Sequence, residues 1–498
     1  NGEPTLHSNI QEAWLKPNSD HSYSIVYSPK FLTLNNAHSK KLLNRDGSPF
    51  KAIIIQNSKN LIAATNNKSN NLVIFTGKAT LSKPLILKTT LAGENYRFTR
   101  YHKDYIVQLG KRGTLHFTAN TKISPNCAAA ICPQNNSSLI GMNVIINKDT
   151  DSLPALSIDH DRSTTSYVNI YNNTFNSRID INTRKSDSHI SFHDNTINIQ
   201  SNNKTTAESA LKIATDQNST LYFDRFDHNI IMLNTKSPFA TGINLQKNSQ
   251  IEWDKPISDV LLQVSDSTAH ATLIGIDNHS IWNGALLRSA IQTIAQKGKS
   301  QGIANHFQWS GNITDSAITS TSSGQWATAI ENSNIWKGSL STTNLAAKTN
   351  GASGISNAIV NNGKWRGSIS HSNLSTYARQ GIATTINNKH NWSPIAKITN
   401  SIIIAHGKQS QSHAIHNSDD WKADITKSYI SATSLQGAAN ALQNTLKWTG
   451  FIGQKGAKTA IMTKGNNQSK AVTNIQKQYL SNATIQTTRH STVNLTHN

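Results

Sequence analysis

Eight of the ten tryptophans of this chain recur at nearly equal intervals in its C-terminal half. The eight positions are Trp253, Trp282, Trp309, Trp336, Trp365, Trp392, Trp421 and Trp448. A fixed period of roughly 20 to 50 residues indicates a supersecondary unit that stacks on copies of itself, and this period is about 28 residues. It therefore predicts a solenoid, and it shifts the search for function from a pocket to a long surface.

Each tryptophan stands within a recurrent pattern. In five of the coils a small residue, an aliphatic residue and an asparagine precede the tryptophan, as in Ala358-Ile359-Val360-Asn361. A Trp-X-Gly triplet begins at five of the eight tryptophans, as in Trp365-Arg366-Gly367. An aliphatic residue then recurs with nearly the same period, at Ile291, Ile318, Leu345, Leu374, Ile402 and Ile430. Short alternating runs separated by Gly, Asn and Ser are typical of strands joined by tight turns.

The repeat residues favour strands over helices. They are rich in Ser, Thr, Asn, Ile and Gly and poor in the helix formers Leu and Glu. We therefore predict an all-β fold, a right-handed single-stranded parallel β-helix with about 28 residues per coil in the C-terminal half. Upstream, segments such as Val168–Phe175, Ile190–Ile197 and Phe226–Ile231 share an I-x-x-N-x-I pattern, with an Asn expected at a left-handed turn.

The domain organisation is predicted as one elongated unit over residues 1–498, because no linker composition interrupts it. Residues 1–125 are expected to form irregular N-terminal coils and a cap, and residues 126–455 the regular coils. Residues 456–498 are expected to form C-terminal coils or a cap, which would protect the open end of the solenoid.

Composition constrains the partners and the compartment. The chain carries 48 Lys and Arg against 27 Asp and Glu, a net charge of +21, although only 15% of its residues are charged. Such an excess attracts anionic polymers. No run of 18 apolar residues is present, and the chain begins without Met or an apolar leader, as expected of a mature exported product.

Two cysteines, Cys127 and Cys132, are separated by four residues. This spacing lacks the second pair that a zinc site would need. We expect a disulfide, as in a secreted protein, with free thiols as the alternative.

The Trp-X-Gly triplets from Trp282 to Trp448, in a Ser/Thr/Asn-rich chain with few cysteines, resemble the passenger domain of bacterial autotransporters of the pertactin and AIDA type. The resemblance covers about 200 of the 498 residues well and about 120 more loosely. It implies export through the outer membrane to the bacterial surface, and adhesion to host matrix, glycans or other cells. The membrane-embedded C-terminal translocator barrel of that family is missing from this sequence.

The leading functional hypothesis is an adhesin, not an enzyme, that binds anionic glycans such as glycosaminoglycans, with fibronectin or other matrix proteins as further partners. Basic residues recur at similar places in the coils, and stacked coils would align them about 5 Å apart. We single out Lys255, Lys337, Arg366 and Lys422 close after tryptophans, Arg288 on a neighbouring face, and Arg97, Arg100 and Lys103 in a basic aromatic segment. The alternative is a basic surface that only keeps the protein in solution.

Two features allow a structural or a binding role. The tryptophans are expected to fill the interior or a corner of the coils, with an exposed sugar-stacking platform as the alternative. The segment Tyr96–Lys103 is expected to be an ordinary strand with a basic face, with glycan or nucleic-acid contact as the alternative.

Two other functions remain open. Self-association could mediate cell aggregation or biofilm formation. A polysaccharide lyase or hydrolase could use acidic residues between the coils: Asp159, Asp161, Asp194, Asp224, Asp227, Asp254 and Asp259. Ser157-Ile158-Asp159-His160 is similar to part of a pectate lyase motif, but its other elements are missing. The hydrolase motifs G-D-S-G and G-x-S-x-G are also missing.

No cofactor or specific nucleic-acid partner is predicted, although charge alone would also attract DNA. The 19 histidines lack H-E-x-x-H or any close ligand spacing, so the sequence predicts no metal site.

Overall fold

The structure is a computed structural model. It describes residues 13–17, 23–27, 52–70, 72–93, 96–101, 104–109, 113–118, 121, 124, 127–147, 153–160, 165–184, 186–266, 271–466, 468–480, 482–487 and 491–496. The chain divides into two compact units. The first comprises Asn1–Asn198 and Asn218–Asp224, and the second comprises Ile199–Gln217 and Arg225–Asn498.

Parallel strands stacked in coils also build the first unit. There β12 (Ser137–Ile140) pairs in parallel with β7 (Thr90–Gly93) and with β15 (Ser166–Tyr171), which pairs in turn with β18 (Ser188–His193). A helix, α3 (Ser58–Asn66), begins after Asn57, whose side chain accepts a hydrogen bond from the backbone N–H of Asn60.

The other strands that begin in the first unit are β1 (Ala13–Pro17), β2 (Tyr23–Tyr27), β3 (Ala52–Ile55), β4 (Leu72–Phe75), β5 (Lys78–Leu81), β6 (Leu85–Leu87), β8 (Tyr96–Tyr101), β9 (Asp104–Leu109), β10 (Thr114–Phe117), β11 (Ile131–Pro133), β13 (Asn143–Ile146), β14 (Leu156–His160), β16 (Thr174–Phe175), β17 (Ile179–Thr183), β19 (Thr196–Gln200) and β21 (Leu221–Asp227). The boundary between the two units lies within β19, after Asn198, and again within β21, after Asp224.

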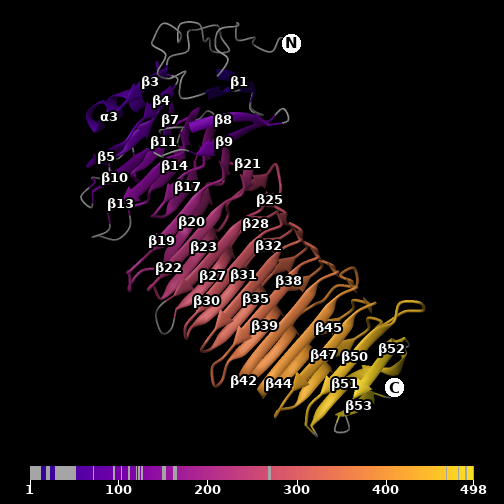
Figure 1. Cartoon of the computed structure of the whole chain (residues 1–498). Coiled ribbons are helices and arrows are strands. Elements are labelled where there is room, and N and C mark those ends of the chain that lie inside the picture. Colours follow the sequence, from indigo (N-terminus) through magenta and orange to yellow (C-terminus); the bar gives the residue numbers. More distant parts are fainter. Residues whose placement is uncertain are drawn as a thin grey trace. The chain divides into compact units, whose positions relative to one another are not determined.

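The central coils of the second unit repeat the same four strand positions. In the coil of Trp336 these are β35 (Trp326–Asn332), β36 (Ile335–Trp336), β37 (Leu340–Ser341) and β38 (Asn344–Thr349). Each strand pairs in parallel with its counterparts one coil before and after, and Trp336 pairs with Trp309 and Trp365. The counterparts β27 (Thr272–Asn278), β31 (Lys299–Asn305), β35 and β39 (Ile355–Asn361) lie side by side (Figure 1).

These pairings confirm the predicted parallel β-helix and its period, because from Trp282 to Trp448 each tryptophan pairs with the next one in the sequence. Within the described residues, helix is limited to α3 and a 3-10 turn, η1 (Lys477–Leu480). The remaining strands of the second unit are β20 (Glu208–Thr215), β22 (Ile230–Thr235), β23 (Phe239–Leu245), β24 (Ile251–Trp253), β25 (Ile257–Ser258), β26 (Leu261–Asp266), β28 (Ile281–Trp282), β29 (Leu286–Leu287), β30 (Ala290–Ala295), β32 (Gln308–Trp309), β33 (Ile313–Thr314), β34 (Ala317–Ser322), β40 (Lys364–Trp365), β41 (Ile369–Ser370), β42 (Asn373–Asn388), β43 (Ile398–Thr399), β44 (Ile402–Asn417), β45 (Asp420–Trp421), β46 (Ile425–Thr426), β47 (Tyr429–Ser434), β48 (Ala439–Asn444), β49 (Lys447–Trp448), β50 (Thr459–Lys464), β51 (Ser469–Gln476), β52 (Ala483–Thr487) and β53 (Ser491–Thr496).

The asparagine of the repeat forms a continuous buried ladder between coils. Each side-chain amide donates to the side-chain oxygen of its counterpart in the next coil, at 2.7 Å from Asn361 to Asn388 and 2.8 Å from Asn332 to Asn361. The ladder includes Asn278, Asn305, Asn332, Asn361, Asn388, Asn417 and Asn444. A buried amide is costly unless it is hydrogen-bonded, and here the repeat itself supplies the partner.

Left-handed turns recur once per coil after the short strands β25, β29, β33, β37, β41, β43 and β46. Their φ angles lie between 47° and 56°, at Asp259, Arg288, Asp315, Thr342, His371, Asn400 and Lys427. Several of these residues are Asp, Asn or His, which tolerate this backbone conformation better than most residues.

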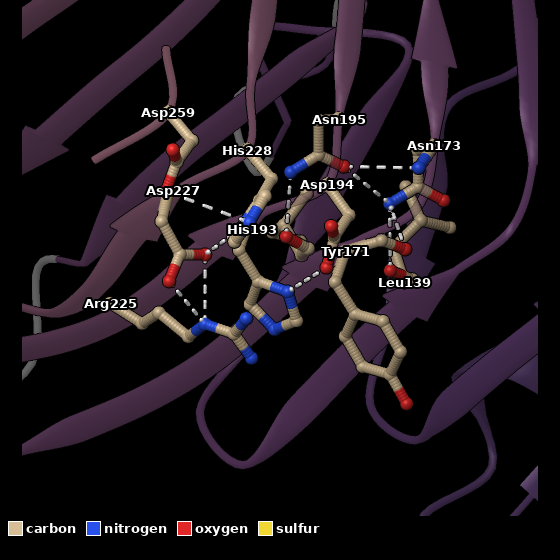
Figure 2. A network of polar contacts seen from close by, with 11 residues as sticks. Leu139, Tyr171, Asn173, His193, Asp194, Asn195, Arg225, Asp227, His228 and Asp259 are labelled. Atoms are coloured by element: carbon tan, nitrogen blue, oxygen red, sulfur yellow. Dashed lines mark hydrogen bonds and ion pairs between the residues drawn. The ribbon is translucent and has the colours of Figure 1, made fainter. Parts of the chain in front are cut away.

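The upstream I-x-x-N-x-I segments need a correction in detail. Where an asparagine was predicted at the left-handed turn, the turn residue is Asn172 in one segment and Asp194 in the next. The recurrent asparagines Asn173 and Asn195 follow it and are buried. Their amides donate to the backbone oxygens of Leu139 and Ile170, at 2.9 and 2.8 Å, and Figure 2 shows both asparagines inside the first unit.

The C-terminal segment continues the coils beyond the tryptophan period. β50 and β51 pair in parallel with β47 and β48, and β52 and β53 pair with β50 and β51. The pairing of β51 with β53 contains register shifts. The predicted boundaries at residues 125 and 455 stay predictions.

Candidate functional site

The tryptophans form an interior row of the second unit. From Trp282 to Trp448, successive rings stack with centroids 4.6 to 5.1 Å apart and interplanar angles of 16° or less. Each of these side chains is at most 5% exposed. The predicted interior position is confirmed, so these rings offer no platform to a sugar.

The glycine of Trp-X-Gly completes the tryptophan's polar contacts. The indole Nε1 of Trp309 donates to the backbone oxygen of Gly311 at 2.8 Å, and that of Trp336 donates to Gly338 at 2.7 Å. A Cβ atom on Gly338 would lie 1.9 Å from the oxygen of Gly311. The close approach between coils therefore explains why a glycine stands two residues after these tryptophans.

The residues directly after the tryptophans form one outward row, here called the basic row. The backbone N–H groups of Lys337 and Arg366 donate to Trp309 O and Trp336 O, and that of Lys422 donates to Trp392 O. The three residues therefore occupy equivalent positions in their coils, as predicted. The whole row reads Asn283, Ser310, Lys337, Arg366, Ser393, Lys422 and Thr449.

The coils add basic residues that sequence reasoning missed. Lys364 precedes Trp365 on the same outward side as Arg366, and Lys389 lies in the turn of the next coil. Lys337, Lys364, Arg366 and Lys389 are exposed. Within the described part of the chain, none of these four has a carboxylate within 4.0 Å, whereas Lys422 lies 3.3 Å from Asp420.

Two other predicted residues of this unit stand apart from the basic row. Ile257 pairs with Leu286, so Lys255 aligns with Gly284 of the next coil. The residue of this coil that aligns with the basic row is therefore Asp254 and not Lys255. Arg288 lies at a left-handed turn and binds Asp259 through Nε and Nη2 at 2.9 and 2.8 Å. These hydrogen bonds lower the pKa of Asp259 and raise that of Arg288.

The basic aromatic segment is confirmed as a strand. β8, which contains Arg97 and Arg100, pairs with β9 in an antiparallel hairpin of the first unit. Lys103 lies outside the described residues.

A second outward surface of the second unit is polar and recessed. In β27, both Gly275 and Ile276 face the interior, because a Cβ on Gly275 would meet Cγ2 of Ile291 at 2.5 Å and Ile276 is 1% exposed. Two successive inward residues bend the strand, so Ile274 and Asp277 both face outward and converge. Both are nevertheless buried, at 3% exposure each.

This bend repeats in each coil and creates two neighbouring lines of residues, together called the recessed rows. His413 and His416, three residues apart, show the convergence, because their ring centroids lie only 5.6 Å apart. One line is Ile274, Gln301, Thr328, Asn357, Thr384, His413 and Asn440, and the other is Asp277, Ala304, Glu331, Val360, Asn387, His416 and Gln443.

The recessed rows carry unsatisfied polar groups and perturbed histidines. Among the described residues, no hydrogen bond is formed by Oδ1 of Asp277, Asn357 or Asn387, or by Oε1 of Gln443. Buried polar oxygens usually have partners, so such a concentration suits a surface that contacts a polar ligand. Burial, followed by the charge of His416, lowers the pKa of His413 to about 4.

The border of the recessed rows holds an exposed aromatic residue outside the tryptophan period. Trp326 is 47% exposed, with Nζ of Lys299 5.7 Å from its ring centroid. Lys299 also pairs with Glu331 at 3.4 Å. Trp326 is not one of the eight periodic tryptophans, and this exception is the sequence signal that could have identified it.

The coils also bring together two histidines that lie one coil apart in the sequence. Nε2 of His279 and Nε2 of His306 lie 3.1 and 3.3 Å from Oδ1 of Asp277. The two imidazole rings stack, with centroids 4.4 Å apart. Sequence reasoning predicted no metal site because it compared short spacings only. His279 and His306 are separated by one coil period, and this separation is the sequence signal that could have revealed the group.

The acidic residues considered for catalysis lie mostly beside basic groups. In the first unit, Asp194 lies 2.7 Å from Nδ1 of His193, and Asp159 lies 3.1 Å from Arg184. In the second unit, Nε of Arg225 donates to Asp227 at 2.8 Å, as Figure 2 shows. Further pairs join Asp224 to His189 and Asp259 to Arg288, whereas Asp161 lies outside the described residues.

The predicted disulfide is present. The sulfurs of Cys127 and Cys132 are bonded, and both residues are buried beside Ala129 and Ile86. The bond closes a short loop of the first unit.

Comparison with protein-family models, with curated proteins and with solved structures finds no match to this chain. In the part of the chain that the structure describes, no helix has the length and apolar character needed to cross a membrane.

Proposed function

We propose that this chain is an exported bacterial surface adhesin that binds anionic glycans along the basic row of its second unit. The observation that carries the proposal is the placement of Lys337 and Arg366 on successive coils. Both are exposed and lie close to Lys364 and Lys389. Neighbouring coils are about 4.8 Å apart, so a linear polyanion lying across the coils would meet several cations in succession.

The neighbouring recessed rows supply the hydrogen-bonding groups that a sugar chain requires. Within one coil, Asn357 precedes Lys364 and Arg366 by less than one turn of the solenoid. The amide side chains of Asn357 and Asn387 lie in these rows, and Trp326 offers an exposed aromatic face. Many weak contacts along one face produce affinity by avidity.

The compartment and the partners follow from the same proposal. The disulfide between Cys127 and Cys132 suits an oxidising, extracellular setting. Sulfated glycosaminoglycans fit the positive surface best, and matrix glycoproteins such as fibronectin are further candidate partners. Binding without catalysis agrees with carboxylates that lie beside arginine and histidine, such as Asp227 and Asp259.

Charge reversal along the basic row tests the proposal. The variant Lys337→Glu/Arg366→Glu/Lys422→Glu is expected to weaken binding to immobilised heparin more than tenfold, measured at about 0.15 M salt where distant charges are screened. Native-like circular dichroism would show that the coils persist.

The matched control reverses two lysines and one arginine elsewhere on the second unit. Lys348, Arg379 and Lys408 are exposed and lie off the basic row, so Lys348→Glu/Arg379→Glu/Lys408→Glu changes the net charge equally. The proposal fails if both variants lose the same affinity, or if heparin, chondroitin sulfate and DNA bind alike and all dissociate near about 0.15 M salt. Those results would indicate a non-specific polycation.

A second candidate function, self-association, has its own supporting observation. One face of the second unit is almost free of charged side chains. It is formed by the outward residues between Leu261 and Thr433 of the paired strands β26, β30, β34, β38, β42, β44 and β47. Among these described residues, the one formally charged side chain is Lys348. This face includes exposed Leu261 and Ile402. Such a face is unusual in a chain of net charge +21 and would allow copies to approach one another.

Sedimentation velocity tests this second function. The variant Ile402→Lys is expected to shift any concentration-dependent oligomer toward the monomer, because it adds a second positive charge to a face that otherwise carries only Lys348. A wild-type protein that stays monomeric at high concentration would exclude self-association by this face.

A further inference from the structure

We propose that Asp277, His279 and His306 form a binding site for a divalent transition-metal ion of the zinc or cobalt class. Asp277 lies in β27, and His279 follows in the turn after this strand. His306 occupies the equivalent turn one coil later, after β31. The backbone N–H groups of His279 and His306 both donate to the preceding coil, to Leu245 O and Asn278 O, which fixes the two turns in register.

The distances among the three side chains fit one shared ion. Oδ1 of Asp277 lies 3.1 Å from Nε2 of His279 and 3.3 Å from Nε2 of His306, and all three atoms lie within 4.8 Å of one another. With metal–ligand bonds of about 2.0 to 2.1 Å in a tetrahedral zinc site, neighbouring ligand atoms are about 3.3 Å apart. An ion at the centre requires the two stacked rings to turn so that both Nε2 lone pairs converge on it.

The buried carboxylate is the second observation that points to a ligand. The side chain of Asp277 is 4% exposed, and no donor among the described residues forms a hydrogen bond with its Oδ1. Burying an ionised carboxylate without a hydrogen bond or a cation is costly. The atoms that face this oxygen are the two imidazole nitrogens, whose directions do not make hydrogen bonds to it. A metal ion would satisfy all three atoms together.

The coil places this group next to a small residue and near solvent. Ala304 stands beside Asp277 on the neighbouring strand, where a larger side chain would compete for the same space. The side chains of His279 and His306 are 41% and 40% exposed, so an ion has access from solvent.

The donor set defines the class of ion and its reactivity. Imidazole nitrogen suits zinc, cobalt, nickel and copper, whereas calcium and magnesium prefer sites made of oxygen alone. Two histidines and one carboxylate leave at least one coordination position for water or an external ligand, whereas structural zinc sites use four protein ligands. The site is independent of the basic row, so either proposal can fail alone.

The test titrates the intact purified chain with Zn²⁺ by calorimetry and with Co²⁺ by visible absorption at pH 7.5. We expect a single tight ion per chain and the intense d–d bands of a Co²⁺ ion with low coordination number. His279→Ala/His306→Ala is expected to weaken binding by about 100-fold or more, since even the outer partners of ligands contribute roughly 10- to 100-fold. Asp277→Asn, which keeps the size of the side chain, is expected to weaken it at least tenfold.

The matched control removes two exposed imidazoles elsewhere, as His371→Ala/His390→Ala, and should bind both ions like the wild type. The proposal is overturned if the wild type binds neither ion at pH 7.5, or if His279→Ala/His306→Ala binds them as tightly as the control. The first measurement needs no variant, so a variant that fails to fold leaves the test intact.

Discussion

Trp336 and Trp365, one coil apart in the sequence, stack with their ring centroids 4.9 Å apart and their planes within 4°. Each indole also donates its Nε1 hydrogen to a backbone oxygen two residues later, at 2.7 Å in both coils. The stack therefore buries large apolar surfaces and leaves no indole donor of these two residues unpaired. Contacts of this kind link one coil to the next through the second unit.

We expect Trp336→Ala to lower the free energy of unfolding of the second unit by about 3 to 5 kcal/mol, the usual range for a fully buried aromatic residue. Denaturant unfolding followed by circular dichroism measures this loss. Trp326→Ala is the matched control, since Trp326 is 47% exposed, and it should change stability little. Equal losses in the two variants would contradict an interior role for the tryptophan row.

Breaking the asparagine ladder should also lower the free energy of unfolding of the second unit. Asn361→Ala removes the acceptor of Asn332 and the donor to Asn388, so two buried amides lose partners. We expect a loss of about 2 to 4 kcal/mol in the free energy of unfolding. Asn334→Ala, at an exposed position of the same coil, should stay within about 0.5 kcal/mol of the wild type. A neutral effect of Asn361→Ala would show that water replaces the ladder.

Acid should destabilise the second unit through His413. Burial lowers its pKa from 6.5 to about 4, so between these values the unfolded state binds the proton and the folded state does not. The stability is complete above pH 6.5 and falls as the pH decreases through this window, by roughly 3 kcal/mol in total. The pH dependence of the unfolding midpoint measures the fall. His413→Gln should reduce this slope, and an unchanged slope would contradict the role of His413.

Removing the disulfide should have a modest and local effect. The bond between Cys127 and Cys132 closes a loop with a sequence separation of 5, so the chain-entropy model predicts a loss of roughly 2 kcal/mol at most. We expect Cys127→Ala/Cys132→Ala to fold and to keep the stability of the second unit. Thermal unfolding with and without reductant measures both effects. Loss of the second unit's transition in the variant would contradict this locality.

The tryptophan period predicted the parallel β-helix, the interior tryptophans and the alignment of Lys337, Arg366 and Lys422 with one another. These results follow from simple counting, because residues one coil apart occupy equivalent positions in parallel strands. The outcome for Lys255 was different. Lys255 comes two residues after Trp253, so it aligns with Gly284 of the next coil. The residues of the basic row come one residue after their tryptophans, and the prediction treated these two positions as equivalent.

The recessed rows were not predictable in this way. Strand alternation would place Gly275 and Ile276 on opposite sides, yet both face inward, and the resulting bend buries Ile274 and Asp277. The direction of a side chain at such a bend depends on how the neighbouring coils pack. The same packing brings His306 of the next coil to Asp277, which already lies beside His279 of its own coil.

The sequence by itself therefore determined which residues repeat and which positions stack, since a regular solenoid converts one period of the sequence into one step between strands. Only the tertiary structure decided which side of the coil each position faces, which charges lie beside an opposite charge and which carboxylate is buried. The physical reason is that these properties depend on bends and on distances of a few ångströms between coils, whereas the period depends only on the length of one turn.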